Sequence, residues 1–495
     1  MAIFSPDDPE AVQLAVQGHL SQFIREWFGQ SNGTNPDTAE GLAEALAAKI
    51  DFVPDAEQQQ LLVALASYLV DAEAGQAFIL KGSAGTGKTS LMQALVSQLR
   101  STATPVYLLA PTGRAAKVLA QRTGKAASTI HKQIYMLEER LDVAGKISGF
   151  SFTLRDFETE EPAVFVVDEA SMLGSMPSKE GLMRTNGLLD DLLRYVFGNS
   201  GWNRLIFVGD PFQLPPVQEI RSAALTGADL ALRGIQSQEF NLREVKRQQR
   251  YSGILQVATQ LRDQLEQKRL FDPVTFELPD DIGQFHSVDA ALEEYLDLYK
   301  QDPDQVTMVT YSNFWAHRIN KKFRRLLHGS EQPMPVPGES MLVIRNHYLN
   351  KSDFIANGEE IDLISHQGEL EEYAGLQWLK AEYAFVDLNG RRHIRHGRVL
   401  FDLLNSKEAG LAPPAYQLLL IARKHAETYG PFDPYLNALQ LKYPYAITTH
   451  KAQGGEWKHV FVLMEKAYGS DELYQRWLYT AITRASGNLY LVAPQ

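Results

Sequence analysis

A glycine-rich segment, Gly82-Ser-Ala-Gly-Thr-Gly-Lys-Thr89, has the residue types and spacing that bind the phosphates of a nucleotide. An apolar run typical of a buried strand precedes it, and leucines follow it at helical spacing. In such a strand, loop and helix, Lys88 reaches the β- and γ-phosphates and the Thr89 hydroxyl ligates Mg²⁺. The backbone N–H groups expected to face the phosphates belong to Gly82, Ser83, Ala84, Gly85, Thr86 and Gly87. The alternative is a glycine-rich turn before an ordinary helix, which the complete pattern disfavours.

Two further apolar runs end in polar side chains that suit nucleotide hydrolysis. Residues 163–167 lead into Asp168 and Glu169, and residues 205–208 lead into a turn that contains Gln213. Adjacent carboxylates after a buried strand are costly unless they are solvated, metal-bound or catalytic. Asp168 is therefore expected to hold the Mg²⁺ shell, and Glu169 to orient and polarise the attacking water. Gln213 is expected to sense the γ-phosphate or the water, although its stretch alone is also typical of a proline-rich turn.

The elements that must position these groups alternate between strand and helix. A strand at 106–110 is followed by Pro111-Thr-Gly-Arg114 and a helix from Ala115. This succession predicts a mostly parallel sheet with helices on both faces, whose ligands collect at the carboxyl ends of the strands. Residues 111–140 hold six Lys or Arg against two Glu, a local basic run for which a solvated helix face is the alternative.

Composition limits the class of protein. The 495 residues predict roughly two to four domains. The absence of cysteine excludes disulfides, thiolate zinc sites and iron–sulfur clusters. Neither a basic or apolar leader nor an apolar run of roughly 18 residues is present, so a cytoplasmic protein without a membrane span is expected. The net charge of −12 disfavours a general nucleic-acid coat protein but permits a local basic channel.

The two ends of the motif region are less informative. Residues 1–60 carry ten acidic residues against Arg25 and Lys49. Helical spacing of apolar residues between Val12 and Trp27 predicts a helix, and a second helix is expected near 38–50. A helical segment packed on the body is preferred over a protein-binding extension.

Several motifs taken together resemble those of superfamily 1 helicases, and most closely the RecD-like and phage Dda-like branch. The motifs that carry the resemblance are Gly82–Thr89, Pro111–Arg114, Ser128-Thr-Ile-His131, Asp168-Glu-Ala-Ser171, Gly209–Gln213, Leu242-Arg-Glu-Val-Lys-Arg247, Tyr445–Glu456 and Tyr479-Thr-Ala-Ile-Thr-Arg484. They extend from about 58 to 484, whereas the first 50 residues and the segment near 326–440 match less clearly.

The resemblance implies an α/β fold of two RecA-like P-loop domains with two insertions. The expected boundaries are an acidic helical extension at 1–50, a first domain at 51–242, a second domain at 243–325 and 440–495, and an inserted SH3-like β-barrel module at 326–439. A small hairpin is expected at about 136–162 within the first domain, since residues 147–153 alternate. Phe150 or Phe152 at its tip is expected to separate the strands, unless the hairpin packs its aromatic residues inward.

The resemblance also implies further roles at the nucleotide. ATP would lie between the domains, with Arg247 and Arg484 reaching the γ-phosphate from the second domain as arginine fingers. The alternative for both is an ordinary surface ion pair. Gln58 would contact the adenine edge, although Gln59 and Gln60 adjoin it, and Glu456 would contact the sugar.

A track for single-stranded DNA follows from the same comparison. Small hydroxyl, amide and basic groups suit contacts to phosphates, which hold a strand without reading its sequence. The residues expected to line the track are Pro111, Thr112, Arg114, Thr129 and His131 in the first domain and Asn313, Thr449, His450 and Lys451 in the second. The basic stretch 391–398 of the barrel could touch DNA or form a solvated face.

The resulting expectation is an ATP- and Mg²⁺-dependent DNA helicase that moves 5′-to-3′ on single-stranded DNA, recognises single/double-strand junctions and is active as a monomer. Roles in repair, replication or recombination, with partners from those processes, are implied by the resemblance alone. The main alternative is a single-stranded DNA translocase that displaces bound proteins with little unwinding. A P-loop kinase would leave the Thr448-Thr-His-Lys451 motif unexplained, and an ATP-driven switch without turnover would leave Glu169 and the two arginines unexplained.

Overall fold

The architecture was analysed in a computed structural model of the chain. It describes residues 38–494 apart from 142–146, 158–160, 178, 181–182, 185, 199–200, 245–252, 270–277, 389 and 466–470. The helix expected between Val12 and Trp27 lies outside the described residues.

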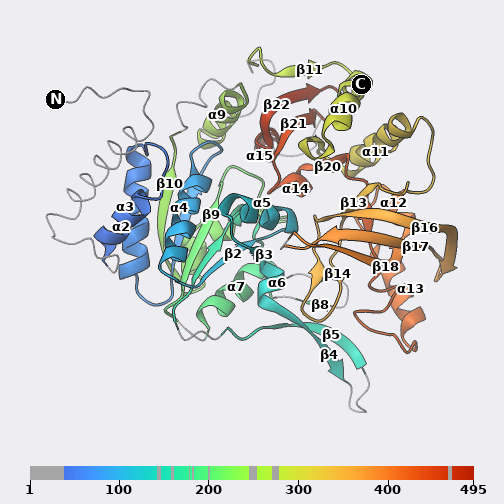
Figure 1. The fold of residues 1–495 in the computed structure, drawn as a ribbon, viewed down its shortest axis with the longest axis horizontal. Helices are drawn as coiled ribbons and strands as arrows, with labels where there is room; N and C mark the ends of the chain where they lie inside the picture. The colour runs from blue at the N-terminus through green and yellow to red at the C-terminus, as the bar shows by residue number, and fades with distance from the viewer. Residues whose placement is uncertain are drawn as a thin grey trace.

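A six-stranded parallel sheet forms the first domain (Figure 1). Its strands, in spatial order, are β10 (Gln236–Leu242), β1 (Gln76–Gly82), β9 (Arg204–Gly209), β6 (Val164–Val167), β2 (Val106–Ala110) and β3 (Ala127–Thr129). The glycine-rich loop follows β1, and the Asp168 and Gln213 turns follow β6 and β9. Because parallel strands end at the same edge, all three turns meet there.

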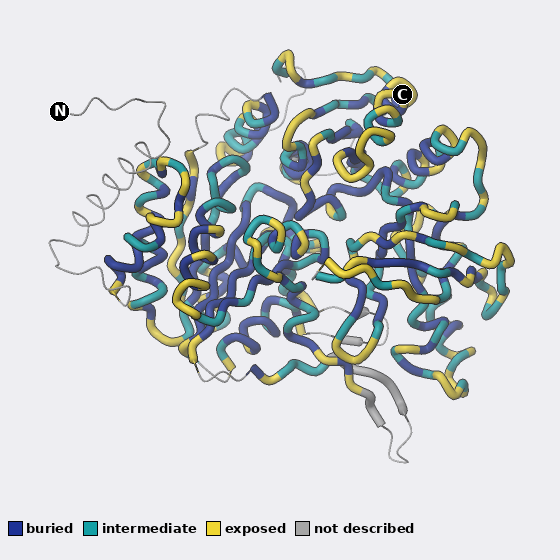
Figure 2. Tube along the Cα trace, in the orientation of Figure 1, coloured by how far each residue is buried: buried dark blue, intermediate teal, exposed yellow. Residues whose placement is uncertain are grey.

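Side chains of alternate residues divide this sheet into two buried faces. Phe78 and Leu80 of β1 pack against one layer of helices, whereas Ala77 and Ile79 pack against the other. The first layer contains α2 (Ala39–Ala47), α3 (Ala56–Asp71), α4 (Lys88–Ser101) and α5 (Gly113–Thr123). The second contains α6 (Ile130–Ile134), α7 (Leu188–Phe197) and α8 (Gly227–Ala231). Strands buried on both sides explain the continuous apolar runs in the sequence (Figure 2).

The expected hairpin and the second N-terminal helix are both present. Strands β4 (Tyr135–Leu141) and β5 (Ile147–Leu154) pair antiparallel and extend from the body (Figure 1). A shorter pair, β7 (Lys179–Glu180) and β8 (Met183–Arg184), lies nearby. The helix expected near 38–50 is α2, which the Thr38 hydroxyl caps, and its Leu42 and Leu46 are buried in the first domain's core.

A second parallel sheet of five strands forms the other RecA-like domain. Its spatial order is β11 (Gly283–Phe285), β22 (Ala485–Val492), β21 (Trp457–Leu463), β12 (Val306–Thr310) and β20 (Ala446–Thr448). The helices packed around it are α9 (Gly253–Glu266), α10 (Val288–Gln301), α11 (Asn313–His328), α14 (Thr449–Ala452) and α15 (Asp471–Ile482).

An antiparallel sheet is inserted between β12 and β20. Its order is β18 (Arg392–Leu400), β17 (Leu376–Val386), β16 (Glu360–Tyr373), β13 (Ser340–Val343) and β19 (Leu441–Lys442). Leu439, just before β19, exchanges backbone hydrogen bonds with Arg398 and Leu400 of β18, so the two edge strands meet and close the sheet into a small barrel. Short elements beside it are β14 (His347–Tyr348), β15 (Phe354–Ile355), α12 (Phe401–Leu404) and α13 (Pro413–Arg423).

The barrel shares its core with the second RecA-like domain. Met341 and Val343 of β13 lie in one apolar cluster with Tyr295 of α10 and Phe323 of α11. The barrel is therefore packed directly against the second RecA-like domain and is not joined to it only by a flexible linker. Within the described part of the chain, no helix is long and apolar enough to cross a membrane.

Candidate nucleotide and nucleic-acid sites

A cavity of about 340 Å³ lies where the first sheet's strand ends face the second domain. It brings together the glycine-rich loop, the carboxylates after β6 and β9, and groups from both domains. The lining residues are Ser83–Ser90, Ala115, Val118, Arg122, Asp168, Glu169, Gly209, Asp210, Gln213, Gly454, Gly455, Glu456, Thr483 and Arg484.

The glycine-rich loop has the backbone that phosphate binding requires. Gly85 and Gly87 have φ values of 79° and 88°, in the left-handed region that glycine adopts without strain. Gly87 leads directly into α4, so the loop ends at a helix N-terminus. Lys88 Nζ donates to the carbonyls of Gly82 at 2.5 Å and Ser83 at 2.9 Å, which keeps its charge within the loop.

Three carboxylates stand at the ends of neighbouring strands. Asp168 accepts a hydrogen bond from the Glu169 backbone N–H at 2.9 Å, and Glu169 itself has a φ of 51°. A left-handed non-glycine residue costs energy and is found preferentially at functional sites. Burial, reinforced by the neighbouring Glu169 charge, raises the pKa of Asp168 to about 6. Burial also raises the pKa of Asp210.

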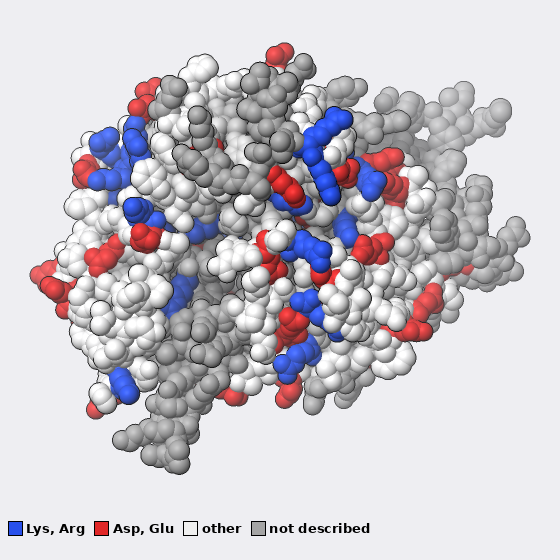
Figure 3. Space-filling model, turned by 180° about the vertical axis from the view of Figure 1, so that it is seen from behind, with Lys and Arg blue, Asp and Glu red and all other residues white. Residues whose placement is uncertain are grey.

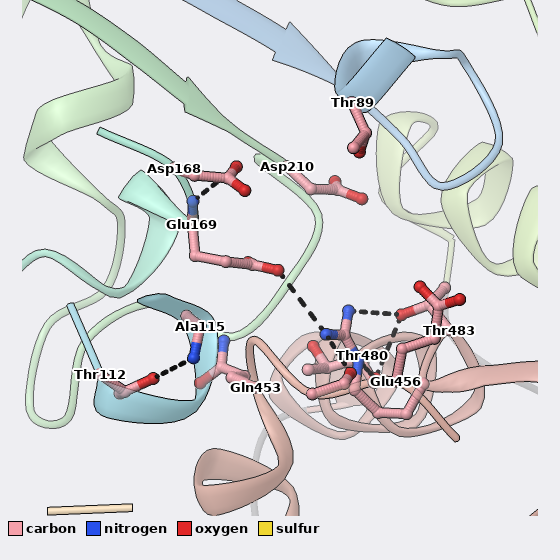
Figure 4. Close-up of polar contacts among 12 residues, drawn as sticks. Thr89, Thr112, Ala115, Asp168, Glu169, Asp210, Gln453, Glu456, Thr480 and Thr483 are labelled. Atoms are coloured by element: carbon pink, nitrogen blue, oxygen red, sulfur yellow. Dashed lines mark hydrogen bonds and ion pairs between the residues drawn. The ribbon is translucent and has the colours of Figure 1, made fainter. Parts of the chain in front are cut away.

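Arg484, Gln213 and Glu169 form a connected group across the domain boundary. Arg484 Nη1 lies 3.7 Å from Glu169 Oε1, the ion pair drawn as the dashed line from the Glu169 carboxylate (Figure 4). With the Gln213 amide nitrogen turned toward Glu169, it donates to Oε2 at 3.3 Å, and the amide oxygen accepts from Arg484 Nη2 at 2.9 Å. The predicted base, sensor and finger are therefore in mutual contact.

Helix α15 holds the turn that carries Gln213. The Tyr479 hydroxyl donates to Asp210 at 2.6 Å and accepts from the Ala84 N–H of the glycine-rich loop at 3.2 Å. Thr480 Oγ1 accepts from the Leu214 N–H at 2.8 Å. These contacts connect the second domain directly to both the phosphate loop and the sensor turn.

The other residues predicted to contact the nucleotide differ in where they lie relative to the cavity. Gln58 lies outside the cavity with 1% of its surface exposed, and its amide donates to Thr86 O and accepts from Asp55 N. A contact from Gln58 to adenine therefore remains a prediction. Glu456 lines the cavity and pairs with Arg122. Arg247 lies outside the described residues.

The cavity fits a magnesium–nucleotide complex in the chemistry of its donors. Thr89 and Asp168 supply the hydroxyl and carboxylate oxygens that Mg²⁺ prefers, and Mg²⁺ commonly takes only one or two protein ligands beside phosphates. Among the described residues, no group of three His, Asp or Glu side chains forms a complete metal cage, so most ligands would have to come from the nucleotide and water.

A second cavity, of about 330 Å³, gathers most of the residues predicted to contact DNA. It lies between the first domain, the second domain and the barrel. Its lining includes Pro111, Thr112, Arg114, Thr129, His131, Met172, Pro215, Pro216, Val217, Asn346, Phe354, Ala356, Asn357, Gly358, His450, Lys451 and Gln453.

The polar groups of this cavity are only partly basic. Thr112 and Thr129 cap the helices α5 and α6 with their hydroxyl oxygens, so both also have a structural role. Burial lowers the pKa of His131 to about 4 and that of Lys451 to about 8. His131 is therefore uncharged at neutral pH, and Lys451 is the more direct source of positive charge.

Arg114 is held by partners that the sequence did not reveal. Its guanidinium stacks on Trp457 at 4.7 Å and pairs with Glu360 of the barrel. It lines the cavity, but part of its charge is already neutralised, which weakens the expected phosphate contact.

Two predicted track residues lie elsewhere. Thr449 is fully buried and its hydroxyl lies 3.4 Å from Thr310 O, so the expectation that it lines the track is wrong in this structure. A threonine one position into α14 points into the domain rather than along its surface. Asn313 lines an adjoining small pocket that Lys451 also borders.

The hairpin residues can be placed only by their backbone. Across β4 and β5, Phe150 pairs with Glu139 in the middle of the hairpin and Phe152 pairs with Leu137 near its base, so neither lies at the turn. Their location at the tip is therefore wrong. At its base, the Leu137 N–H donates to Lys351 O at 3.1 Å, and Leu137 packs against Tyr348 and Phe354 beside the barrel.

Two residues that line the cavity, and one that contacts the glycine-rich loop, were not predicted. Asp210 follows a buried strand just as Asp168 does, and that pattern would have identified it. Arg122 belongs to the basic run at 111–140, which indicated charge but no partner. Arg262 of α9 donates to Ser83 Oγ at 3.2 Å, and no sequence motif marked it.

On the face seen in Figure 3, lysine and arginine side chains are interspersed with acidic ones. A continuous basic stripe is absent from the described part of that face.

Two family models match the chain. Residues 55–288 match the model described as AAA domain, and residues 443–492 match the model described as UvrD-like helicase C-terminal domain. The first contains the glycine-rich loop and the Gln213 turn, and the second contains Glu456 and Arg484.

Characterised relatives match over most of the chain. It is similar to the ATP-dependent DNA helicase Dda of Enterobacteria phage T4, with 25% identity over 83% of this chain and 93% of that protein. It is also 25% identical to the ATP-dependent RecD2 DNA helicase of Deinococcus radiodurans, over 88% of this chain and half of that protein. The chain spans 36% of an uncharacterised protein of Methanocaldococcus jannaschii, at 22% identity.

Among solved structures, the Pif1 helicase of Candida albicans aligns with 90% of this chain and 94% of its own, at 16% identity and a TM-score of 0.43.

Proposed function

We propose that this chain, which belongs to the superfamily 1 helicases of the Dda, RecD and Pif1 type, is an ATP-dependent DNA helicase that moves 5′-to-3′ on single-stranded DNA. The observation that carries the proposal is the group of Glu169, Gln213 and Arg484, because it assembles hydrolytic side chains from two domains around one phosphate-binding loop. A kinase or a passive switch has no need of that arrangement.

In the proposed cycle, the loop N–H groups and Lys88 bind the polyphosphate. Glu169 accepts a hydrogen bond from the attacking water and Gln213 orients it. Arg484 stabilises the charge that develops on the transferred phosphoryl oxygens. Its contact depends on the two domains being together, so hydrolysis is tied to closure of the cleft.

Thr89 and Asp168 are the residues that would hold Mg²⁺. When bound, the ion neutralises charge on the phosphate oxygens. Asp168 needs its ionised form for this role, and a nearby cation would favour that form over the protonated one that burial promotes.

The 330 Å³ cavity is the proposed site of the DNA strand. Pro111 and Thr112 follow β2 of the first domain, and His450 and Lys451 belong to α14 of the second domain. A bound DNA strand would therefore touch both motor domains. Differential affinity of open and closed forms for this strand would convert closure into movement. The hairpin beside the cavity is the proposed separating element.

Strand displacement on matched duplexes with a 5′ tail, a 3′ tail or no tail tests the proposal directly. We expect ATP-dependent displacement of the 5′-tailed duplex alone, and none by Lys88→Ala. Displacement from the 3′ tail alone would overturn the proposed direction.

ATP turnover stimulated by single strands without any displacement would instead support a translocase. Binding streptavidin to a biotin at the end of a single strand then distinguishes a translocase from an ATPase that does not move along DNA. A translocase displaces the streptavidin, and a non-translocating ATPase does not.

A further inference from the structure

Arg122 lies in the last turn of α5 and lines the nucleotide cavity, although it belongs to none of the motifs that identified the site. Its side chain is 35% exposed. The first turn of the same helix borders the DNA cavity through Arg114, so α5 extends from one proposed ligand site to the other.

The two contacts of Arg122 reach opposite sides of the cavity. Nη1 donates to Thr89 Oγ1 at 3.3 Å, on the helix that follows the phosphate loop. Nη2 pairs with the Glu456 carboxylate, which belongs to the second domain. Thr89 is the proposed metal ligand and Glu456 the proposed sugar contact. The phosphates join these two ends of a nucleotide, so the Arg122 guanidinium stands beside the path that they would follow.

The charge balance of the cavity indicates why a cation at the Arg122 position would matter for phosphate binding. Its described lining contains three cations, Lys88, Arg122 and Arg484, against four carboxylates. Lys88 donates to carbonyls of its own loop, and Arg484 is held by Glu169 and backbone carbonyls. A polyphosphate therefore depends strongly on each cation, and a planar guanidinium is well suited to phosphate oxygens.

Folding alone does not explain the Arg122 pair. Both partners are partly exposed, at 35% and 44%, and ion pairs with that exposure contribute little to stability. The contacts also use only some of the guanidinium's five N–H donors.

We propose that Arg122 is a further nucleotide-binding residue that contacts the phosphates from α5, at its position between Thr89 and Glu456. The inference rests on the proposed function, since it assigns a residue to the same nucleotide site. It makes α5 a helix that would touch the nucleotide through Arg122 and the DNA strand through Arg114 and its N-cap Thr112.

Equilibrium displacement of a fluorescent ADP analogue tests the inference without requiring turnover. The competitors are ADP and inorganic tripolyphosphate, which has no sugar or base. We expect Arg122→Gln to weaken both competitors by about 10- to 100-fold, as loss of a charge-assisted hydrogen bond would. Glu456→Gln should weaken ADP but not tripolyphosphate.

The matched control is Arg100→Gln. Arg100 lies at the end of α4 and donates to the carbonyl of Gly124, two residues after Arg122. It is outside the cavity lining, so its replacement should leave binding of both competitors unchanged. Unchanged tripolyphosphate binding by Arg122→Gln, with ADP weakened as in Glu456→Gln, would show that Arg122 acts only through Glu456 and would overturn the inference. Normal binding by Lys88→Ala would instead contradict the nucleotide site itself.

Discussion

Arg484 carries its charge inside the protein, with 5% of its surface exposed. Its Nε donates to Thr480 O at 3.0 Å and Nη1 to Gly455 O at 3.2 Å. These carbonyls fix the guanidinium beside Glu169 before any ligand contact is needed. A preorganised donor of this kind avoids the cost of reorganisation during reaction.

We expect Arg484→Lys to lower ATP turnover by about 10²- to 10³-fold while changing ADP affinity much less, because the charge is retained but the fixed donor is lost. Single-turnover hydrolysis and ADP titration measure the two quantities. Arg476→Lys is the control, since Arg476 lies on α15, the helix that leads to Arg484, and donates to Pro211 O at 2.6 Å but does not line the cavity. Equal losses in both variants would indicate general damage to α15.

Residue types in motifs predicted most of the cavity lining, but not the partners of each side chain. Arg114 pairs with Glu360 and Arg122 with Glu456, residues separated by 246 and 334 positions. Such pairs depend on how domains meet, which local spacing does not encode. Thr449 was placed wrongly for a related reason. Its motif was recognised, but the direction of its side chain depends on packing within the second domain, which local spacing does not encode either.

At the scale of elements, apolar runs predicted the strands well because parallel strands are buried on both faces. The barrel strands are longer than apolar runs alone would indicate, since β16 extends to Tyr373 and β17 begins at Leu376. Residues 365–369 of β16 are polar and mostly exposed, so this part of the strand lacks the apolar signal. Backbone pairing between the two strands holds them instead.

The hairpin of β4 and β5 is held at its base by Leu137, which is 2% exposed and packs on Tyr348 and Phe354. We expect Leu137→Ala to slow strand displacement, because removing a buried leucine weakens packing by about 2–5 kcal/mol and lets the hairpin move relative to the barrel. ATP turnover stimulated by single strands should stay near the parental rate. The rate of displacement of a 5′-tailed duplex is the measurement.

Met136→Ala supplies the comparison for that prediction. Met136 neighbours Leu137 on β4 but is 37% exposed, so its truncation should leave displacement unchanged. If Leu137→Ala also displaced strands at the parental rate, a rigidly held hairpin would not be needed for separation.

At the scale of the whole molecule, the two cavities are neighbours built partly from the same segments. Glu169 lines the proposed nucleotide cavity and Met172 lines the proposed DNA cavity. The turn after β9 contributes Gln213 to the first and residues 215–217 to the second. Movement of either ligand would therefore shift the binding site of the other through a few residues of shared backbone.

Tyr479 is the residue through which the second domain would sense that coupling. Its hydroxyl joins Ala84 of the phosphate loop to Asp210 of the turn after β9, and it is fully buried. In Tyr479→Phe both partners lose their contact, and a buried polar group without a partner costs about 1–3 kcal/mol. The lost contact destabilises the state in which the two domains are in contact. We therefore expect stimulation of ATP turnover by single-stranded DNA to fall by about 5- to 150-fold.

Tyr295→Phe is the matched control for that experiment. Its hydroxyl is equally buried and donates to Tyr445 O at 2.8 Å, but both residues belong to the second domain and its surroundings, away from the interface. It should lower the melting temperature without changing the ratio of stimulated to basal turnover. A reduced ratio in Tyr479→Phe alone would therefore assign the loss to contact between the domains, whereas an unchanged ratio would mean that DNA stimulates hydrolysis by another route.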